Sequence, residues 1–245
     1  EKAEHLHLSR LTKAQQLEII KSELSDGGAE LLERARRIPR LRDVIGIPFY
    51  LRAIASLGSV DALPQYKGEI IEKFIAQHIS RYERNQILQT ELDGSHDTYL
   101  EFLALKMALL GTPTLTDDDT RAAFSDAIPD LQARYRDTNA SLGRIVEILV
   151  AHHMLIQQDV GSEVNYSFQH QQFQEWYASL YVERLIIKAV SNTGDSIASL
   201  YEKVVNYAAW KEPILFAVER LSRRSPEGAQ AVGKLVLKTL GIDPM

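Results

Sequence analysis

The sequence contains no cysteine among its 245 residues, and glycine and proline are sparse, with 13 and 8 copies. Without cysteine there is no disulfide framework, no cysteine-ligated zinc or iron–sulfur site and no thiol nucleophile. The low glycine and proline content, with 45% hydrophobic residues, excludes collagen-like, low-complexity and wholly disordered chains. We therefore expect an ordinary globular protein, and a reducing, cytoplasmic compartment is the natural setting.

Long hydrophobic runs and strong net charge are also missing. No apolar stretch approaches the roughly 18 residues of a membrane-spanning helix, so no membrane contact is expected. The formal net charge is −5, which argues against a nonspecific grip on nucleic acid, since phosphate binding needs a concentrated basic surface. The chain starts at Glu1, and His5 to Leu8 has the character of a strand end entering a turn. We expect the chain to be a segment of a longer protein.

The motifs of common active sites are absent as well. The phosphate-binding loop, a glycine-rich turn that ends in Gly-Lys-Ser/Thr, does not occur in the sequence. Lys21-Ser22 and Lys238-Thr239 lie inside predicted helices and follow no such turn. The adjacent pair His152-His153 would point in directions about 100° apart on a helix, which suits neither a metal site nor a proton relay. No His-Glu-x-x-His or Gly-x-Ser-x-Gly pattern occurs. We expect no catalytic residues, no metal ligands and no complete active site within this chain.

Helical periodicity dominates the first third of the chain. Leu17, Ile20 and Leu24 follow the i, i+3, i+7 spacing, with Thr12 as the N-cap. Apolar spacing and helix-breaking residues together predict four helices, at residues 13–24, 29–37, 49–57 and 66–84. The polar stretch 86–96 is predicted to be a linker that contains a domain boundary.

The remainder predicts a mainly α fold with one short β-hairpin. Helices are expected at residues 99–110, 116–124 and 142–153, and a long helix at 171–190. Between them the period changes from 3.6 to 2, which predicts a hairpin over 154–168 with its turn at Gly161-Ser162. Three helices followed by a hairpin is the pattern of a winged helix. Beyond residue 190, breaks at Gly194, Pro213, Pro226 and Gly228 predict an antiparallel helical array.

One segment, Phe168 to Ala178, carries specific information. It combines a strand end, a histidine at a strand-to-helix junction, and a helix rich in aromatic residues. The free N–H groups of a helix N-terminus together with an imidazole can meet an anion such as a phosphate. Judged on the residues alone, a capping or packing role is favoured for His170.

The segment closely resembles a signature of the winged-helix domain in NACHT-type STAND signalling NTPases, which include inflammasome receptors and bacterial antiphage sensors. That signature is Phe-x-His-x-x-Phe-Gln-Glu-x-x-Ala, and it is matched by Phe168, His170, Phe173, Gln174, Glu175 and Ala178. Gly46-Ile47-Pro48-Phe49-Tyr50-Leu51 resembles the Gly-x-Pro motif of the family's helical lid, and His5 to Thr12 resembles the end of its nucleotide-binding core. The resemblance covers roughly residues 1 to 190.

The resemblance implies four parts. They are the end of the NTPase core (1–12), a helical lid domain (13–88), a winged-helix domain (96–190) and the start of a further helical region (191–245). It also implies that Pro48 packs against the adenine of a nucleotide and that His170 reaches the β-phosphate of ADP. The cofactors would be ADP and ATP, with Mg²⁺ held by an NTPase core outside this chain.

The function that the resemblance implies is regulatory. The chain would clamp ADP against its own N-terminal NTPase core at rest, then open for homo-oligomerisation and signalling, as in antiphage defence. Since Walker A and Walker B motifs are missing, this chain itself would not be an enzyme, whereas the full-length protein would be an ATPase. From the residues alone, a ligand-free role as the first residue of a helix is favoured for Pro48.

Two other classes remain open. The first is a winged-helix DNA-binding transcriptional regulator, whose groove-entering helix should carry basic or amide side chains. The candidate helix 142–153 offers only Arg144 as a basic residue, and no direct contact with nucleic acid is expected. The second is a purely helical adaptor, against which the predicted hairpin counts.

Overall fold

The computed structural model describes residues 9–24, 26–58, 63–80, 82–134, 140–152, 154–191 and 200–239. The chain divides into two compact units, unit 1 (residues 1–80) and unit 2 (residues 81–245). Helices predominate in both, and unit 2 adds a small antiparallel sheet. The predicted mainly α fold with a β-hairpin is confirmed.

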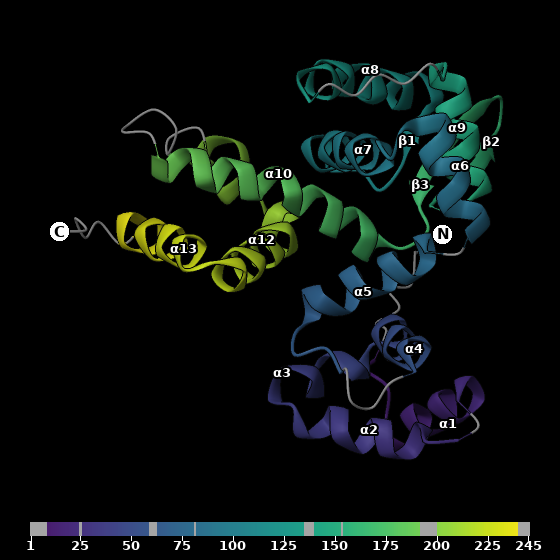
Figure 1. Cartoon of the computed structure of the whole chain (residues 1–245), viewed down its shortest axis with the longest axis vertical. Coiled ribbons are helices and arrows are strands. Elements are labelled where there is room, and N and C mark those ends of the chain that lie inside the picture. The colour runs from purple at the N-terminus through teal and green to yellow at the C-terminus, as the bar shows by residue number, and fades with distance from the viewer. Residues whose placement is uncertain are drawn as a thin grey trace, which may run out of the picture. The chain divides into compact units, whose positions relative to one another are not determined.

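Unit 1 consists of helices packed around aliphatic side chains. Its elements are α1 (Lys13–Glu23), α2 (Gly28–Arg37), α3 (Pro39–Arg42), the 3₁₀ helix η1 (Val44–Gly46), α4 (Pro48–Leu57) and α5 (Lys67–Ile79). The helix α1 contacts α2 and α4, and α4 contacts α5 (Figure 1). Ile20, Leu51 and Ile70 are completely buried where these helices meet, and burial of such side chains is the main stabilising contribution.

Local chemistry sets the start of α1 as expected. The Thr12 hydroxyl accepts a hydrogen bond from the Gln15 backbone N–H at 3.3 Å, and the Gln15 side chain accepts one from the Thr12 N–H at 2.9 Å. This reciprocal capping box satisfies two N–H groups that the helix leaves unpaired. The predicted Thr12 cap is confirmed.

Unit 2 is built around one long helix, α10. Its helices are α6 (Tyr82–Leu92), α7 (His96–Leu110), α8 (Asp117–Ala133), α9 (Leu142–Ala151), α10 (Gln171–Ser191), the π-helix η2 (Tyr201–Val205), the 3₁₀ helix η3 (Ala208–Trp210), α12 (Lys211–Arg224) and α13 (Pro226–Thr239). Figure 1 shows α10 running between α7 on one side and α12 with α13 on the other, and all three helices contact it.

The sheet of unit 2 has three strands in the order β1, β3, β2. They are β1 (Leu115–Thr116), β2 (Leu155–Val160) and β3 (Glu163–Phe168), and both pairings are antiparallel. The connection between β2 and β3 is the predicted two-residue turn, and only its first residue, Gly161, has a positive φ of 67°. That conformation fits the tight hairpins in which glycine takes the first central position. The strand β1 was not predicted.

The predicted linker at residues 86–96 is wrong, because most of it lies in α6. Leu88 and Leu92 are fully buried one helical turn apart, but polar residues surround them in the sequence and hide this short stripe. The helix predicted over 66–84 ends at Ile79, and the two units meet in the chain between Ser80 and Arg81.

Other helix boundaries also differ from expectation. The helix capped by Thr116 continues past the predicted end at Phe124 and includes Pro129. The C-terminal array contains α12 and α13, but Pro213 and Gly228 lie within their first turns and not between helices. The predicted break at Gly194 lies outside the described residues.

Candidate functional site

The junction between β3 and α10 holds His170. The strand ends at Phe168 and the helix begins at Gln171, so His170 immediately precedes the first helical residue. Its backbone carbonyl accepts a hydrogen bond from the Phe173 N–H at 3.0 Å, which closes the first turn. The imidazole stays at the surface and meets the Phe173 ring edge-on, with the ring centroids 5.5 Å apart.

Partial desolvation lowers the pKa of His170 below its ordinary value of 6.5, because a charged imidazolium is poorly solvated there. The imidazole is therefore neutral at pH 7, with one nitrogen as donor and the other as acceptor. A neutral ring can still donate to a phosphate oxygen, and the charge on that phosphate would strengthen the bond.

The aromatic residues after His170 anchor α10. Phe173 and Tyr177 are buried, and the Tyr177 ring stacks on Phe168 at 5.8 Å between centroids. The Tyr177 hydroxyl donates to Asp97 of α7 at 3.0 Å, and burial raises its pKa well above the ordinary value. Trp176 is half-buried and carries the Arg220 guanidinium over its ring. Phe173 and Tyr177 therefore belong to the core of unit 2, whereas Trp176 lies at its margin.

A pocket of about 260 Å³ opens beside the first turns of α10. Its lining includes Gln174, Glu175 and Ala178 of the signature segment, together with the end of α7 and the residues Gly111 to Pro113. The Gln171 amide donates to Glu175 at 2.9 Å near its mouth. Gln171 lines this pocket, but His170 does not.

Pro48 is the first residue of α4, as expected, and its ring is exposed. The preceding turn is fixed to the segment before α1, since the Gly46 carbonyl accepts a hydrogen bond from the Leu11 N–H at 2.8 Å. A Cβ atom at Gly46 would lie 3.3 Å from the Arg10 Cβ, so this contact requires glycine or a shift of Arg10. The close approach explains why glycine stands two residues before the proline.

Pro48 and His170 belong to different units, so each is described within its own unit. Pro48 presents an apolar ring at the surface of unit 1, and His170 presents a neutral imidazole at the surface of unit 2. Within the described ranges, no three acidic or histidine side chains gather as a group that could hold a metal ion.

Sequence reasoning missed a set of ion pairs on α10. Glu183 and Arg184 are adjacent in the sequence, but Glu183 pairs with α12 and Arg184 pairs with α7. The Glu183 carboxylate accepts from Arg220 of α12 at 2.5 Å, while Arg184 donates to the buried Glu101 of α7 at 2.7 Å. Burial raises the pKa of Glu101 despite the attraction of Arg184. No local sequence pattern predicts these ion pairs, because the partner residues lie 37 and 83 positions away in the sequence.

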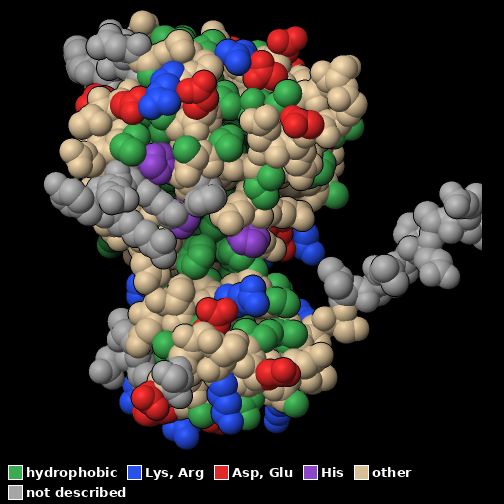
Figure 2. Space-filling view, turned by 90° about the vertical axis from the view of Figure 1, so that its right-hand side faces the viewer, with side chains coloured by type: hydrophobic (Ala, Val, Ile, Leu, Met, Phe, Trp, Pro, Cys, Tyr) green, Lys and Arg blue, Asp and Glu red, His purple; other side chains and the backbone are tan. Residues whose placement is uncertain are grey.

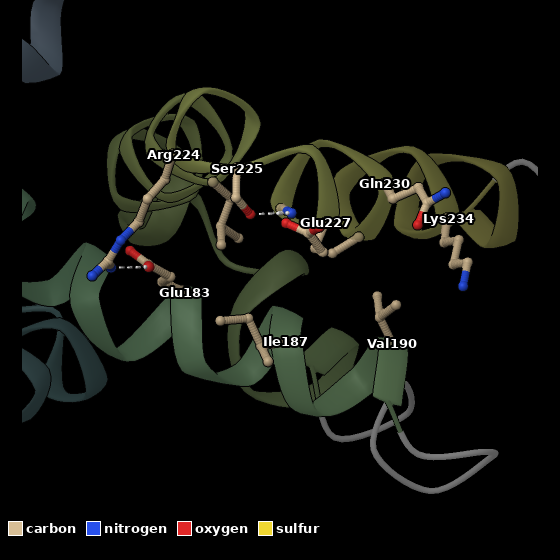
Figure 3. Close-up of a pocket in the computed structure, with 11 residues that line it drawn as sticks. Glu183, Ile187, Val190, Arg224, Ser225, Glu227, Gln230 and Lys234 are labelled. Carbon is tan, nitrogen blue, oxygen red and sulfur yellow. Dashed lines mark hydrogen bonds and ion pairs between the residues drawn. The ribbon is translucent and has the colours of Figure 1, made fainter.

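A second pocket, of about 360 Å³, lies between α10, α12 and α13. Figure 3 shows Ile187 and Val190 projecting from α10 toward α13, with Arg224 and Glu183 joined at one end. At the far end Gln230 and Lys234 flank the opening (Figure 3). The floor is apolar and the rim carries charges of both signs, so neither an anion nor a cation is favoured.

Basic side chains do not form a nucleic-acid surface on the candidate recognition helix. The Arg144 guanidinium holds both oxygens of Glu91, at 2.8 and 2.9 Å, and also contacts Glu147. On the face of unit 2 that Figure 2 shows, Lys and Arg side chains lie beside Asp and Glu side chains and do not gather into a basic patch.

No protein-family model matches the chain, and no curated protein matches it either. None of the described helices combines the length and the apolar character needed to cross a lipid bilayer.

Proposed function

We propose that this chain is the regulatory segment of a NACHT-type STAND ATPase. It clamps ADP against an NTPase core at rest and releases it when the protein opens, oligomerises and signals in the cytoplasm. Residues 1–12 are the end of the NTPase core, and the lid assigned to residues 13–88 comprises α1 to α5 of unit 1. Residues 96–190 are the winged helix, and the helices beyond residue 190 lead toward a sensor. The ordered pair of motifs carries the proposal: Gly46 to Pro48 at a helix start, then Phe168 to Ala178 at a strand-to-helix junction.

Two side chains would meet the nucleotide. The exposed ring of Pro48 is suited to pack against the flat face of an adenine, and the His170 imidazole can donate to a phosphate oxygen beside the first turn of α10. Bound ADP supplies the negative charge that makes such a hydrogen bond strong. The chain lacks a phosphate-binding loop, so its own contribution is to select the resting arrangement and not to hydrolyse ATP.

The competing class is a winged-helix regulator of transcription. The single arginine of α9 is engaged by Glu91 and Glu147, and a guanidinium held bidentately by a carboxylate is poorly placed to read a base. These contacts count against the DNA-binding role. A sequence-specific mobility shift of duplex DNA at physiological salt would reverse that preference.

The decisive experiment replaces His170 in the protein extended upstream to include its NTPase core. His170→Ala removes a hydrogen bond worth roughly 1.5 to 3 kcal/mol when the acceptor is charged, so ADP dissociation should accelerate by about ten- to a hundredfold. Spontaneous oligomerisation should rise with it, since only the closed state loses stabilisation.

The matched control is Gln169→Ala, which alters the neighbouring exposed residue and should leave ADP release unchanged. A lowered melting temperature with an unaltered rate of ADP dissociation would assign His170 a packing role and refute the proposal.

A further inference from the structure

The strand β2 is the outer strand of the sheet and its far edge is exposed. Five of its six residues, Ile156 to Val160, are exposed to solvent, and no described strand pairs with that side. Natural edge strands are usually protected by charged side chains, most often lysine, by proline or by a bulge. This strand has no lysine or proline, Asp159 is its one charged residue, and its pairing with β3 is continuous over all six residues.

The backbone groups that face outward can be identified from the hairpin. The Gln169 N–H donates to the Met154 carbonyl, which makes those two residues a hydrogen-bonded pair of the antiparallel ladder. Since such pairs alternate, Ile156, Gln158 and Val160 bond to β3. The N–H and C=O groups of the alternate residues, Leu155, Gln157 and Asp159, therefore point to the free edge. Within the described chain these groups have no backbone partner.

The side chains on this edge are unusual for a solvent-facing strand. Ile156 is 38% exposed and Val160 is 60% exposed, and they lie on the same face, opposite to the buried Leu155. Their neighbours across the hairpin are Ser167 and Glu163, which cover neither apolar group. The strand thus presents backbone groups without a backbone partner together with two partly exposed apolar side chains.

We propose that two copies of this chain associate through β2, by antiparallel pairing of the strand with its own copy about a two-fold axis at Gln158. This register places Ile156 opposite Val160 of the other copy, twice, and so covers both apolar side chains. It also places Gln157 opposite Asp159 of the other copy. The Gln157 amide, which donates to Asp159 of its own chain at 3.4 Å, can then donate to the carboxylate of the other copy instead. The outward N–H and C=O groups of these two residues then bond across the interface.

Neighbouring registers are less favourable. A two-fold axis at Asp159 would bring the two Asp159 carboxylates face to face, and like charges directly opposite each other destabilise a sheet. An axis at Gln157 would set Ile156 against Gln158 and Leu155 against Asp159. The interface is therefore self-complementary in one register, which selects a second copy as the occupant.

The association is expected to be weak and reversible. Strands of six residues bury far less than the roughly 1,200 Å² of a standard stable interface. The interface does not involve Pro48 or His170, so the inference does not depend on nucleotide binding.

Sedimentation velocity on the 245-residue chain, from about 10 μM to about 1 mM, tests the proposal. The sedimentation coefficient should rise toward that of a dimer over this range. In parallel, amide hydrogen exchange of Gln157 and Asp159 should slow by about two- to threefold at the highest concentration. Exchange at Gln158 and Val160 should not change, because β3 already protects those amides.

Matched variants localise the interface. Gln157→Pro removes an outward N–H without touching the ladder to β3 and should abolish self-association, whereas Gln157→Thr keeps the N–H and should retain it. Val160→Lys should also abolish it, while Val236→Lys, at a valine of α13 that is 50% exposed, should not.

Sedimentation that is independent of concentration up to about 1 mM would overturn the proposal. So would association that survives both Gln157→Pro and Val160→Lys, or that Val236→Lys abolishes equally well.

Discussion

The clearest energetic test of unit 2 is the removal of Arg220, which joins α12 to α10. Its guanidinium donates to Glu183 at 2.5 Å and to the Ser179 hydroxyl at 2.9 Å, and it lies over the Trp176 ring at 5.5 Å. The side chains of Glu183 and Arg220 are only 10% and 16% exposed. Arg220→Ala therefore leaves the Glu183 carboxylate largely buried and without its closest positive charge.

The magnitude follows from these contacts. Removing one partner of a buried ion pair costs about 3 to 5 kcal/mol, and loss of the contact with Trp176 adds about 0.5 to 1 kcal/mol. Arg224 remains 3.3 Å from Glu183 and offsets part of the loss from its exposed position. We expect the free energy of unfolding to fall by about 2 to 4 kcal/mol.

Urea unfolding followed by circular dichroism measures this change. Arg223→Ala, at an exposed arginine of the same helix, should stay within about 1 kcal/mol of wild type. The pair Glu183→Leu with Arg220→Met should be milder than Arg220→Ala alone, because no buried charge loses its partner. Equal costs for Arg220→Ala and Arg223→Ala would refute the assignment of a stabilising ion pair.

Two further predictions concern α13 and α7. Gly228→Ala should lower the free energy of urea unfolding by about 1 to 3 kcal/mol, because its Cβ would lie 2.2 Å from the Leu221 carbonyl oxygen. Gly233→Ala, on the same helix with no atom within 4 Å, should instead raise it by about 0.5 to 1 kcal/mol, and equal effects would contradict the packing argument. The pKa of Glu101 is raised in the folded state, so its contribution is fully present below its ordinary pKa of 4.5 and is lost as pH rises through the raised value. Unfolding measured from pH 4 to 7 should therefore show a smaller loss of stability for Glu101→Gln than for wild type, and an identical pH dependence would show that Glu101 does not titrate as described.

Features with a complete local signal could be predicted from the sequence. Thr12 with Gln15, Pro48 at a helix start, and Gly161-Ser162 between alternating strands each carry their cause within four residues. Thr116 likewise caps α8 through the Asp119 N–H. In each case the local backbone favours a small set of residue types at one position, and the sequence supplies one of them.

Features whose cause is distant in the chain could not be predicted. The strand β1 has only two residues and exists because β3, about 50 residues later, pairs with it. The helix α6 is specified by Leu88 and Leu92, which are informative only once their burial in unit 2 is known. For the candidate site, His170 could be located in advance, but the lowered pKa of its imidazole and the network around Glu183 could not.

The ion pairs of Glu183 with α12 and of Arg184 with α7 restrict how α10 can move. A rotation of the helix about its own axis would break the contact with α12 and the contact with α7 in the same step, whereas a tilt that carries these neighbours along breaks neither. With 21 residues at about 1.5 Å each, the helix is about 31 Å long. If α10 moves as one rigid body, we expect a displacement beside His170 to carry α12 and α13 with it, because both helices contact α10.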